Sequence, residues 1–379
     1  MSQTEGDLAD LPDQPEQHAA ATLAALRRMN PPRLLQLLTR WPTPGAAVAA
    51  VRAGHAADAF ECMEPKHLAL ARAWAGAVDA TAAAITRTLG ERGTHVLHVS
   101  GPGYPIDEGI EDRPGVLFAE GKRLDVLEQP RVAVVGTRAA TPHGLADARE
   151  LGAALARAGV VVVSGLAIGI DGEAHEGALD AGGAVIGVVA TGLDVVYPRR
   201  HGALYERVRD CGLLVTEQPF GIGPHPARFP VRNRIIAALS DVCIVVEATQ
   251  RGGARITARH SLEYGRSVLA IPGSRRNPSA RGCNELIAEG AQPLLDPADI
   301  AVALDLSPGS RRHPARGHPG LGGATTEERA VFRALGGEPA TADELVTRTG
   351  LTPGAVALAA AGLVRAGHAT RAHGLVWPR

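Results

Sequence analysis

The sequence has few aromatic residues and few cysteines. Aromatic side chains make up 3% of the 379 residues, so a long row of base-stacking side chains is not expected. Its cysteines are Cys62, Cys211, Cys243 and Cys283, each more than 30 residues from the next. Because no Cys-x-x-Cys pair exists, the usual zinc spacings are excluded, and we expect buried or free thiols in a reducing compartment.

Long apolar runs and a strong net charge are also missing. No 18 consecutive residues are apolar, and the N-terminus lacks a basic region followed by an apolar run, which predicts a cytoplasmic protein without a membrane span. A net charge of -1 means that any nucleic-acid site must be local. One local candidate is the segment 199–281, with 14 arginines against 6 acidic residues, although lysine is limited to Lys66 and Lys122.

The first quarter of the chain has two parts that differ in composition and pattern. Residues 1–18 are polar and acidic, and we expect them to be disordered. Residues 19–92 carry helical patterns separated by proline or glycine, which predicts a small helical module of the SAM or helix-hairpin-helix kind. With 9 basic and 10 acidic residues over positions 1–100, DNA binding and protein docking stay equally open for this module.

Residues 93–306 are predicted to form the main domain. Two short strands at its start are followed by six runs of Val, Ile and Leu without polar alternation, which is typical of strands buried on both faces of a parallel sheet. Helical patterns lie between these runs, at 143–159, 173–182, 201–212, 234–240 and 256–265. We therefore predict a doubly wound α/β domain whose ligands bind beyond the carboxyl ends of the strands.

The C-terminal part predicts a linker and a third domain. Residues 307–323 are rich in Pro, Gly and Arg, as in linkers. Residues 324–379 have the order of a winged helix, with three short helices and a two-stranded tail. Because residues 352–362 contain no charged side chain, the third helix has nothing to offer base edges or phosphates, and we favour protein docking for it.

The strongest site candidate is the stretch 229–239. Arg232, Asn233 and Arg234 follow a proline-rich loop and precede an apolar run, so we expect them to open a helix. A helix start presents free N–H groups and the positive end of the helix dipole, which favour anions. With two guanidinium groups added, the expected ligand is a phosphate chain.

Two glycine-rich turns should face the same ligand. They follow consecutive strands at 134–142 and 164–175, where Gly136, Gly165 and Gly169 are expected to let the backbone approach an anion. Neither turn is a dinucleotide fingerprint or a P-loop. The remaining residues of this candidate DNA-binding set are Thr137, Arg138, Ser164, Arg199, Arg200 and Arg255.

No catalytic arrangement stands out, so we expect no catalytic residue, no metal and no cofactor. Asp171 and His175 are four residues apart, but we interpret Asp171 as a helix N-cap and His175 as a packing residue. Asp194 is expected to bond the backbone of its own turn. Tyr197 and Phe229 are available for an occasional base stack, yet packing beside proline is the favoured interpretation.

Eight ordered motifs carry a family resemblance. They are V-G-T-R (135–138), S-G-L-A-I-G-I-D-G-E-A-H (164–175), T-G-L-D-V-V-Y-P (191–198), F-P-V-R-N-R-I-I-A-A-L-S (229–240), V-V-E-A (245–248), I-T-A (256–258), I-P-G (271–273) and G-C-N-E-L-I-A-E-G-A (282–291). The chain thereby resembles the DNA processing protein A family, DprA or Smf.

The resemblance implies an extended Rossmann fold and a non-catalytic protein. It implies a homodimer that binds single-stranded DNA and loads RecA recombinase during natural transformation, with single-strand binding protein as a further partner. The implied DNA contacts are Arg138, Arg232, Asn233 and Arg234. Two departures concern contact details, because residues 252–255 replace the usual S-G-S-L and His201 stands where the family commonly has Asn.

A nucleotide-binding sensor or a phosphoribohydrolase-like enzyme of a related Rossmann-like fold is the alternative. Phosphoribohydrolases that cut nucleoside monophosphates carry a P-G-G-x-G-T-x-x-E run. The nearest segment, R-G-G-A-R-I-T-A-R at 251–259, lacks its Thr and Glu spacing.

Overall fold

The computed structural model describes most of the chain in two compact units, Met1–Ser310 and Arg311–Arg379. The described residues are 14–60, 65–296, 299–300, 303–304, 326–335, 340–365, 369–372 and 375–378. The predicted linker lies outside them, as does most of the predicted disordered tail. Helix α1 begins at Gln14, so the expectation of disorder is wrong for residues 14–18.

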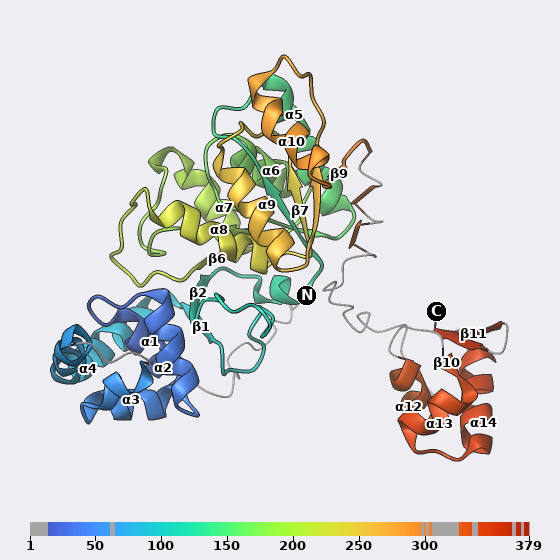
Figure 1. Ribbon diagram of the computed structural model, residues 1–379, viewed down its shortest axis with the longest axis horizontal. Helices are drawn as coiled ribbons and strands as arrows, with labels where there is room; N and C mark the ends of the chain where they lie inside the picture. Colours follow the sequence, from blue (N-terminus) through green and yellow to red (C-terminus); the bar gives the residue numbers. More distant parts are fainter. Residues whose placement is uncertain are drawn as a thin grey trace, which may run out of the picture. The chain divides into compact units, whose positions relative to one another are not determined.

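A nine-stranded sheet forms the centre of the first unit (Figure 1). Its order is β1-β2-β6-β5-β4-β3-β7-β8-β9, and all neighbours from β6 to β9 are parallel. The predicted strand pair at the start of the domain forms an antiparallel edge, because β1 pairs with β2 and β2 pairs with β6. The strands are β1 His95–His98, β2 Val116–Glu120, β3 Arg131–Val135, β4 Val161–Ser164, β5 Val185–Val188, β6 Leu213–Thr216, β7 Val242–Val245, β8 Ser267–Ala270 and β9 Gln292–Pro293.

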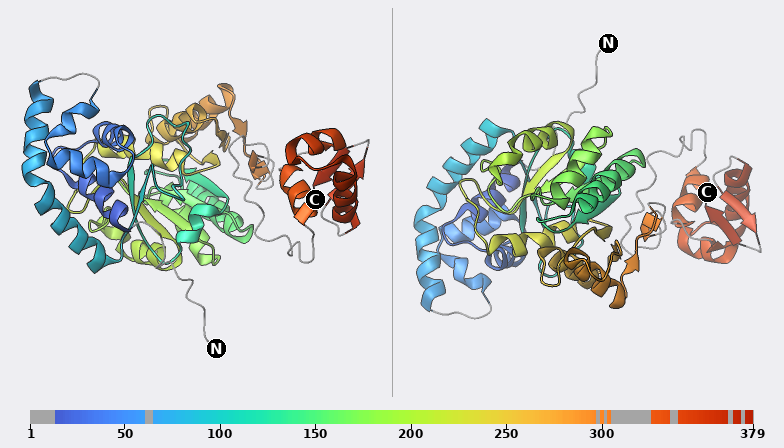
Figure 2. Two further views of the ribbon diagram at one scale, coloured as in Figure 1. Left: turned by 90° about the horizontal axis from the view of Figure 1, so that it is seen from below. Right: turned by 90° about the horizontal axis from the view of Figure 1, so that it is seen from above.

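Helices cover both faces of this sheet (Figure 2). Val132 and Val134 of β3 belong to one core, with side chains of α5, α6 and α7, whereas Ala133 and Val135 belong to the other, with side chains of α8, α9 and α10. Successive strand residues point to opposite faces, so an all-apolar strand needs both covers. The helices are α5 Pro142–Arg157, α6 Ile170–Asp180, α7 Gly202–Cys211, α8 Arg228–Ala238, α9 Gly253–Glu263 and α10 Arg281–Ala288. The doubly wound α/β prediction is confirmed.

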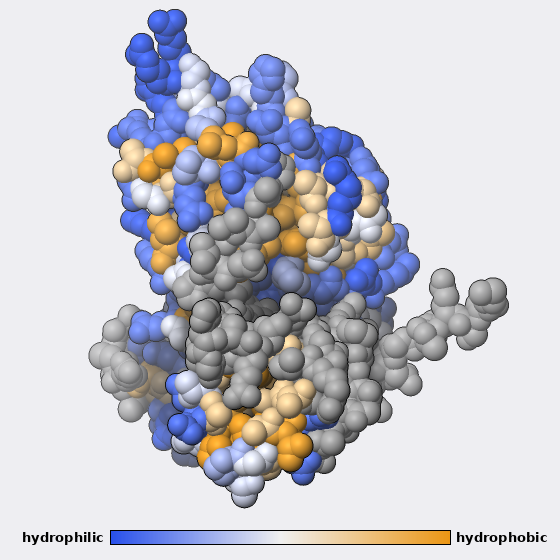
Figure 3. All heavy atoms as spheres, turned by 90° about the vertical axis from the view of Figure 1, so that its right-hand side faces the viewer, coloured by the Kyte–Doolittle hydropathy of each residue, from blue (hydrophilic) through white to orange (hydrophobic). Residues whose placement is uncertain are grey.

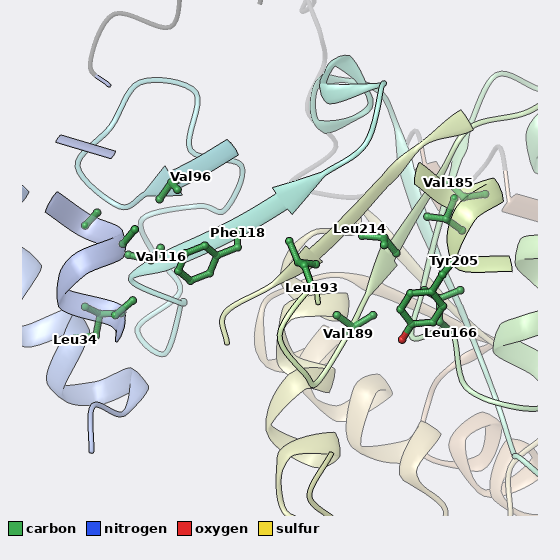
Figure 4. Packing of buried hydrophobic residues seen from close by; sticks show 14 of the residues in the cluster. Leu34, Val96, Val116, Phe118, Leu166, Val185, Val189, Leu193, Tyr205 and Leu214 are labelled. Atoms are coloured by element: carbon green, nitrogen blue, oxygen red, sulfur yellow. The ribbon is translucent and has the colours of Figure 1, made fainter. Parts of the chain in front are cut away.

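The N-terminal helices join the same core. Leu34 of α2 lies in one hydrophobic cluster with Val96, Val116 and Phe118 of the antiparallel edge (Figure 4). The elements are α1 Gln14–Ala25, α2 Pro31–Arg40, α3 Pro44–Arg52, η2 His55–Ala59 and α4 Pro65–Arg92. At the end of α4, Arg92 donates to both carboxylate oxygens of Glu120 on β2 at 2.8 and 2.9 Å. The helical module and the sheet are therefore parts of one compact unit.

Helix α4 is long and apolar enough, over His67–Arg92, to cross a membrane by length and composition alone. Core helices of soluble proteins pass the same test. Here Trp74 and Val78 of α4 are buried in the hydrophobic core. The absence of a membrane span stays a prediction.

The second unit has the predicted winged-helix order. Its elements are α12 Thr326–Leu335, β10 Ala340–Thr341, α13 Ala342–Thr349, α14 Pro353–Arg365, β11 Ala369–Ala372 and β12 Leu375–Pro378. Short β10 was not predicted, and it pairs with β12 beside the expected two-stranded tail. Thr341 and Glu344 form a reciprocal capping box that starts α13. On α14, Leu358 is 77% exposed, and the docking role of this helix stays a prediction.

Candidate functional site

The two predicted glycine turns lie at the carboxyl edge of the parallel sheet. The turn with Gly136 and Arg138 follows β3, and the turn with Ser164 and Gly165 follows β4, which pairs with β3. The loop after β5 carries Arg199 and Arg200 to the same edge, because His201 Nδ1 lies 3.0 Å from Leu166 O in the β4 turn. Seen from the right-hand side of Figure 1, the visible surface mixes hydrophilic areas with smaller hydrophobic patches (Figure 3).

Helix α8 corrects the predicted helix start. It begins at Arg228, so Arg232, Asn233 and Arg234 lie in its second turn rather than at its first residues. Pro230 falls in the first turn, where the N–H that proline lacks would have no partner within the helix. The unpaired N–H groups therefore do not belong to the Arg-Asn-Arg triplet.

Arg232 is buried under the edge of the sheet. Its side chain is 5% exposed, and Nη1 donates to Gly165 O at 2.8 Å and to Val188 O, while Nε donates to Asn233 Oδ1 at 3.2 Å. Burial lowers the pKa of Arg232, and the charge of nearby Asp171 opposes this shift. In this arrangement Arg232 braces the ends of β4 and β5 and does not face solvent.

Three other predicted contacts also have partners inside the protein. Arg234 is 6% exposed and forms an ion pair with Glu217, which follows β6. Asn233 Nδ2 donates to Gly253 O at 3.2 Å. Arg255 pairs with Glu289, the C-cap of α10, at 2.9 Å and also with Glu285 of α10. These side chains join α8 to the sheet and to α9, and α9 to α10.

The glycines of the two turns lie in close contact with other parts of the protein. A Cβ at Gly165 would lie 2.5 Å from Arg232 Nη2, and one at Gly136 would overlap the side chain of Ile170. Gly169 has a φ of 88°, and its Cβ would lie 2.5 Å from Thr137 O. Each close approach is therefore made by the protein itself, and these contacts alone account for glycine at the three positions.

Buried carboxylates occupy the places where an external anion was expected. Glu247 follows β7, is 7% exposed, and accepts from Thr141 N at 2.9 Å and from Thr141 Oγ1 at 2.6 Å at the start of α5. Asp171 is not the N-cap of α6, which is Gly169, and it accepts instead from Gly165 N at 3.1 Å. Burial raises the pKa of Asp171, against the opposing charge of Arg232. The positive charge at these helix N-termini and at the buried arginines is thus largely balanced by carboxylates of the protein itself.

Arg138 remains exposed and lies on an aromatic pair. Its guanidinium carbon is 4.8 Å from the centroid of the Phe229 ring, and this ring is 5.5 Å from the ring of Tyr197. Tyr197 is 38% exposed, and its backbone is held by buried Tyr205, whose hydroxyl donates to Tyr197 O at 2.8 Å. An arginine and two rings thus form one surface at the edge of the sheet, which we name the Arg138 stack.

Arg199 and Arg200 extend this surface. They form the short helix η4, Arg199–His201, directly after Tyr197 and Pro198, and both side chains are exposed. Within the described part of the chain, neither has an acidic side chain within salt-bridge distance. The two guanidinium groups are therefore free to bind an anion.

Thr137 and Ser164 complete the predicted set. Thr137 is half-buried, and its backbone N–H donates to Glu247 O at 2.8 Å. Ser164 is fully buried and donates from Oγ to Val134 O at 2.6 Å. Both residues hold the turn that presents Arg138.

Sequence reasoning missed the carboxylates Glu217 and Glu247, although each stands just beyond an apolar strand run. It also missed four exposed arginines at the neighbouring β7, β8 and α10 loops, namely Arg251, Arg275, Arg276 and Arg281. Their position after strand runs was a usable signal, because the carboxyl ends of parallel strands share one edge of the sheet.

The other polar interpretations have mixed outcomes. The packing role of His175 is confirmed, since its ring is fully buried and burial lowers its pKa to about 4. Asp194 accepts from Gly221 N at 2.9 Å in a distant loop, so the expectation of a bond within its own turn is wrong. Cys243 and Cys283 are buried thiols and Cys211 is exposed, while Cys62 lies outside the described residues. No group of three or more His, Cys, Asp or Glu side chains is arranged for a metal among the residues described.

Comparisons with known proteins agree with this architecture. The family model for DNA recombination-mediator protein A matches residues 95–305, and that for the DprA winged helix domain matches residues 315–363. The chain belongs to the DprA family. The resemblance carried by the eight motifs is therefore confirmed.

Relatives in this family match between half and two thirds of the chain. A putative DNA processing protein DprA of Mycobacterium tuberculosis is 42% identical over 249 residues, 64% of this chain and 63% of the relative. The matched stretch thus spans under two thirds of that relative's length. The DNA processing protein DprA of Bacillus subtilis is 39% identical over 56% of this chain and 72% of its own.

Solved DprA structures share the fold. The X-ray structure of DprA from Streptococcus pneumoniae has a TM-score of 0.65 and 33% identity, covering 76% of this chain and 97% of that one. A Helicobacter pylori DprA structure, whose description concerns its single-stranded DNA binding mode, has a TM-score of 0.50 and 30% identity, covering 56% of this chain and 95% of its own.

Proposed function

We propose that this protein binds single-stranded DNA along the carboxyl edge of its sheet, without catalysis. The observation that carries the proposal is the Arg138 stack with Arg199 and Arg200 beside it. Exposed guanidinium groups bind phosphates, and exposed rings accept bases of any sequence. The Helicobacter pylori relative described for its single-stranded DNA binding supports this choice of ligand.

The predicted residues divide into two roles in this proposal. Arg138, Arg199 and Arg200 contact phosphates directly, while bases stack on Phe229 or Tyr197. A second set holds these residues in place through the contacts described above. It comprises Gly136, Thr137, Ser164, Gly165, Gly169, Arg232, Asn233, Arg234 and Arg255.

We also propose the biological role that the family resemblance implies. In the cytoplasm the protein, as a homodimer, holds an incoming strand and loads RecA recombinase on it, with single-strand binding protein as a further partner. No step needs a cofactor or a metal. Family membership supports this role, whereas the sheet edge supports the DNA binding only.

The test is salt-dependent binding of a single-stranded oligonucleotide by Arg138→Ala/Arg200→Ala. Each lost phosphate contact should flatten the log-log salt slope by about 0.7, so the double variant should lose about 1.4 and bind all sequences more weakly. The matched control is Arg87→Ala/Arg157→Ala, which removes two exposed arginines from α4 and from the far end of α5. Unchanged affinity and slope in the first variant would show that DNA does not bind at this edge.

A further inference from the structure

A cavity of about 680 Å³ lies on the helical module. The α1–α2 turn and one side of α4 form its walls. Its lining residues are Arg27, Arg28, Arg33, Ala69, Leu70, Ala73, Trp74 and Ala77. No residue of the Arg138 stack belongs to it.

The α1–α2 turn is built to present cations. Trp74 Nε1 donates to Arg27 O at 2.9 Å, and Arg33 Nη1 donates to Arg28 O at 3.0 Å, so the turn's carbonyl groups are held by the protein. Arg28 has a φ of 61°, a backbone conformation that residues other than glycine rarely adopt. The side chains of Arg27 and Arg28 are exposed and, within the described residues, form no ion pair or hydrogen bond.

The floor of the cavity is apolar. It consists of Ala69, Leu70, Ala73 and Ala77 on the outer turns of α4, above the buried ring of Trp74. These residues lie inside a helix, so their backbone groups are already hydrogen-bonded, and an extended peptide would find no main-chain partners. A flat base or a sugar needs none. Among the described residues, the lining contains no acidic side chain, which favours an anionic ligand.

We propose that this cavity is a second contact site for single-stranded nucleic acid. Phosphates lie against Arg27, Arg28 and Arg33, and a base or sugar packs on the alanines of α4. The inference rests on the proposed function. Because the helical module shares one hydrophobic core with the sheet, the two sites have a fixed separation. A strand long enough to reach both sites therefore binds two surfaces at once, which raises its affinity without new contacts at either site.

The experiment compares Arg27→Ala/Arg28→Ala with the charge-matched control Arg72→Ala/Arg87→Ala, which alters exposed arginines of α4 outside the cavity. Using fluorescent oligo-dT of 10 and of 60 nucleotides, roughly one and many site lengths, we expect the first variant to weaken only the long strand and to flatten its salt slope by about 1.4. The control should keep the parent slope.

A second pair of variants tests the cavity without changing charge. Ala73→Trp fills it, whereas Ala80→Trp places the same ring on an exposed position of α4 outside the lining. We expect Ala73→Trp alone to weaken the long strand. Photocrosslinking with 4-thiothymidine should mark the peptide 69–77 in the parent chain and lose that mark in Ala73→Trp.

The outcomes separate this inference from the proposed function. If Arg138→Ala/Arg200→Ala weakens binding while the cavity variants leave slope, affinity and crosslinks unchanged, the sheet edge binds DNA and the cavity does not. If the edge variant has no effect but the cavity variants do, the proposed function at the edge fails alone. If the cavity variants lose binding to a glutamate-rich peptide that the parent protein binds, while their oligonucleotide binding is unchanged, the cavity binds an acidic protein and the inference is overturned.

Discussion

Glu217→Gln should lower the free energy of unfolding, although it removes no positively charged side chain. Glu217 and Arg234 form an ion pair in which each side chain is 7% exposed, and Arg234 Nη1 is buried with no hydrogen-bond partner. The substitution leaves the buried guanidinium without a counter-charge. Burial raises the pKa of Glu217 against the opposing charge of Arg234, so the pair already carries a desolvation cost.

The expected loss of stability is about 3–5 kcal/mol, the usual cost of breaking a buried ion pair from one side. Replacing both partners, as in Glu217→Leu/Arg234→Leu, should cost much less because no buried charge is left alone. The control is Asp180→Asn, whose carboxylate pairs with Arg149 and Arg207 while 46% exposed. Exposed pairs of this kind contribute about 0–1 kcal/mol.

Urea unfolding followed by circular dichroism measures these free energies, and oligonucleotide binding is measured in parallel on folded protein. If Arg234 were instead a direct phosphate contact, Glu217→Gln would free its guanidinium and strengthen DNA binding. An unchanged unfolding midpoint together with tighter binding would therefore refute the structural role that we assign to this arginine.

Three further outcomes follow from the structure. Phe229→Ala should weaken single-stranded DNA binding by about 1–3 kcal/mol at an unchanged salt slope, since it removes a ring and no charge; a flatter slope would argue against stacking. Because the folded pKa of His175, about 4, is below the unfolded value of about 6.5, the unfolded state binds the proton first, and about 3 kcal/mol of stability is lost as pH falls through this window. His175→Gln should remove that pH dependence in urea titrations, whereas exposed His143→Gln should retain it. Gly165→Ala, whose Cβ meets Arg232, should lower the melting temperature by an equivalent of about 1–3 kcal/mol, whereas Gly253→Ala, with open space around it, should be nearly neutral.

The sheet and its helices were predictable because they depend on local pattern. Runs such as the one at 132–135 are apolar on both faces, and only a strand covered on both sides accommodates that. Helix boundaries were less predictable. The start of α8 moved to Arg228 because Pro230 is tolerated in a first turn, and the apolar run after it gave no sign of this.

The candidate site was predictable in location but not in the role of each residue. Arg138 and Arg232 look alike in sequence, because each stands two residues after a glycine or a proline. Arg232 is buried and donates to Gly165 O, 67 residues away in sequence, whereas Arg138 is exposed and lies over the ring of Phe229. Partners so distant in sequence leave no local pattern.

The sequence by itself thus determined the α/β class, the sheet edge at which the candidate turns lie, and the family. Hydrophobic periodicity and the order of motifs depend only on the order of residues along the chain, so they are visible without the fold. Only the tertiary structure decided which charges face solvent, because burial and pairing depend on what the fold brings together. Glu217 and Asp171 compensate Arg234 and Arg232 inside the protein, and Arg138, Arg199 and Arg200 are left to meet a ligand.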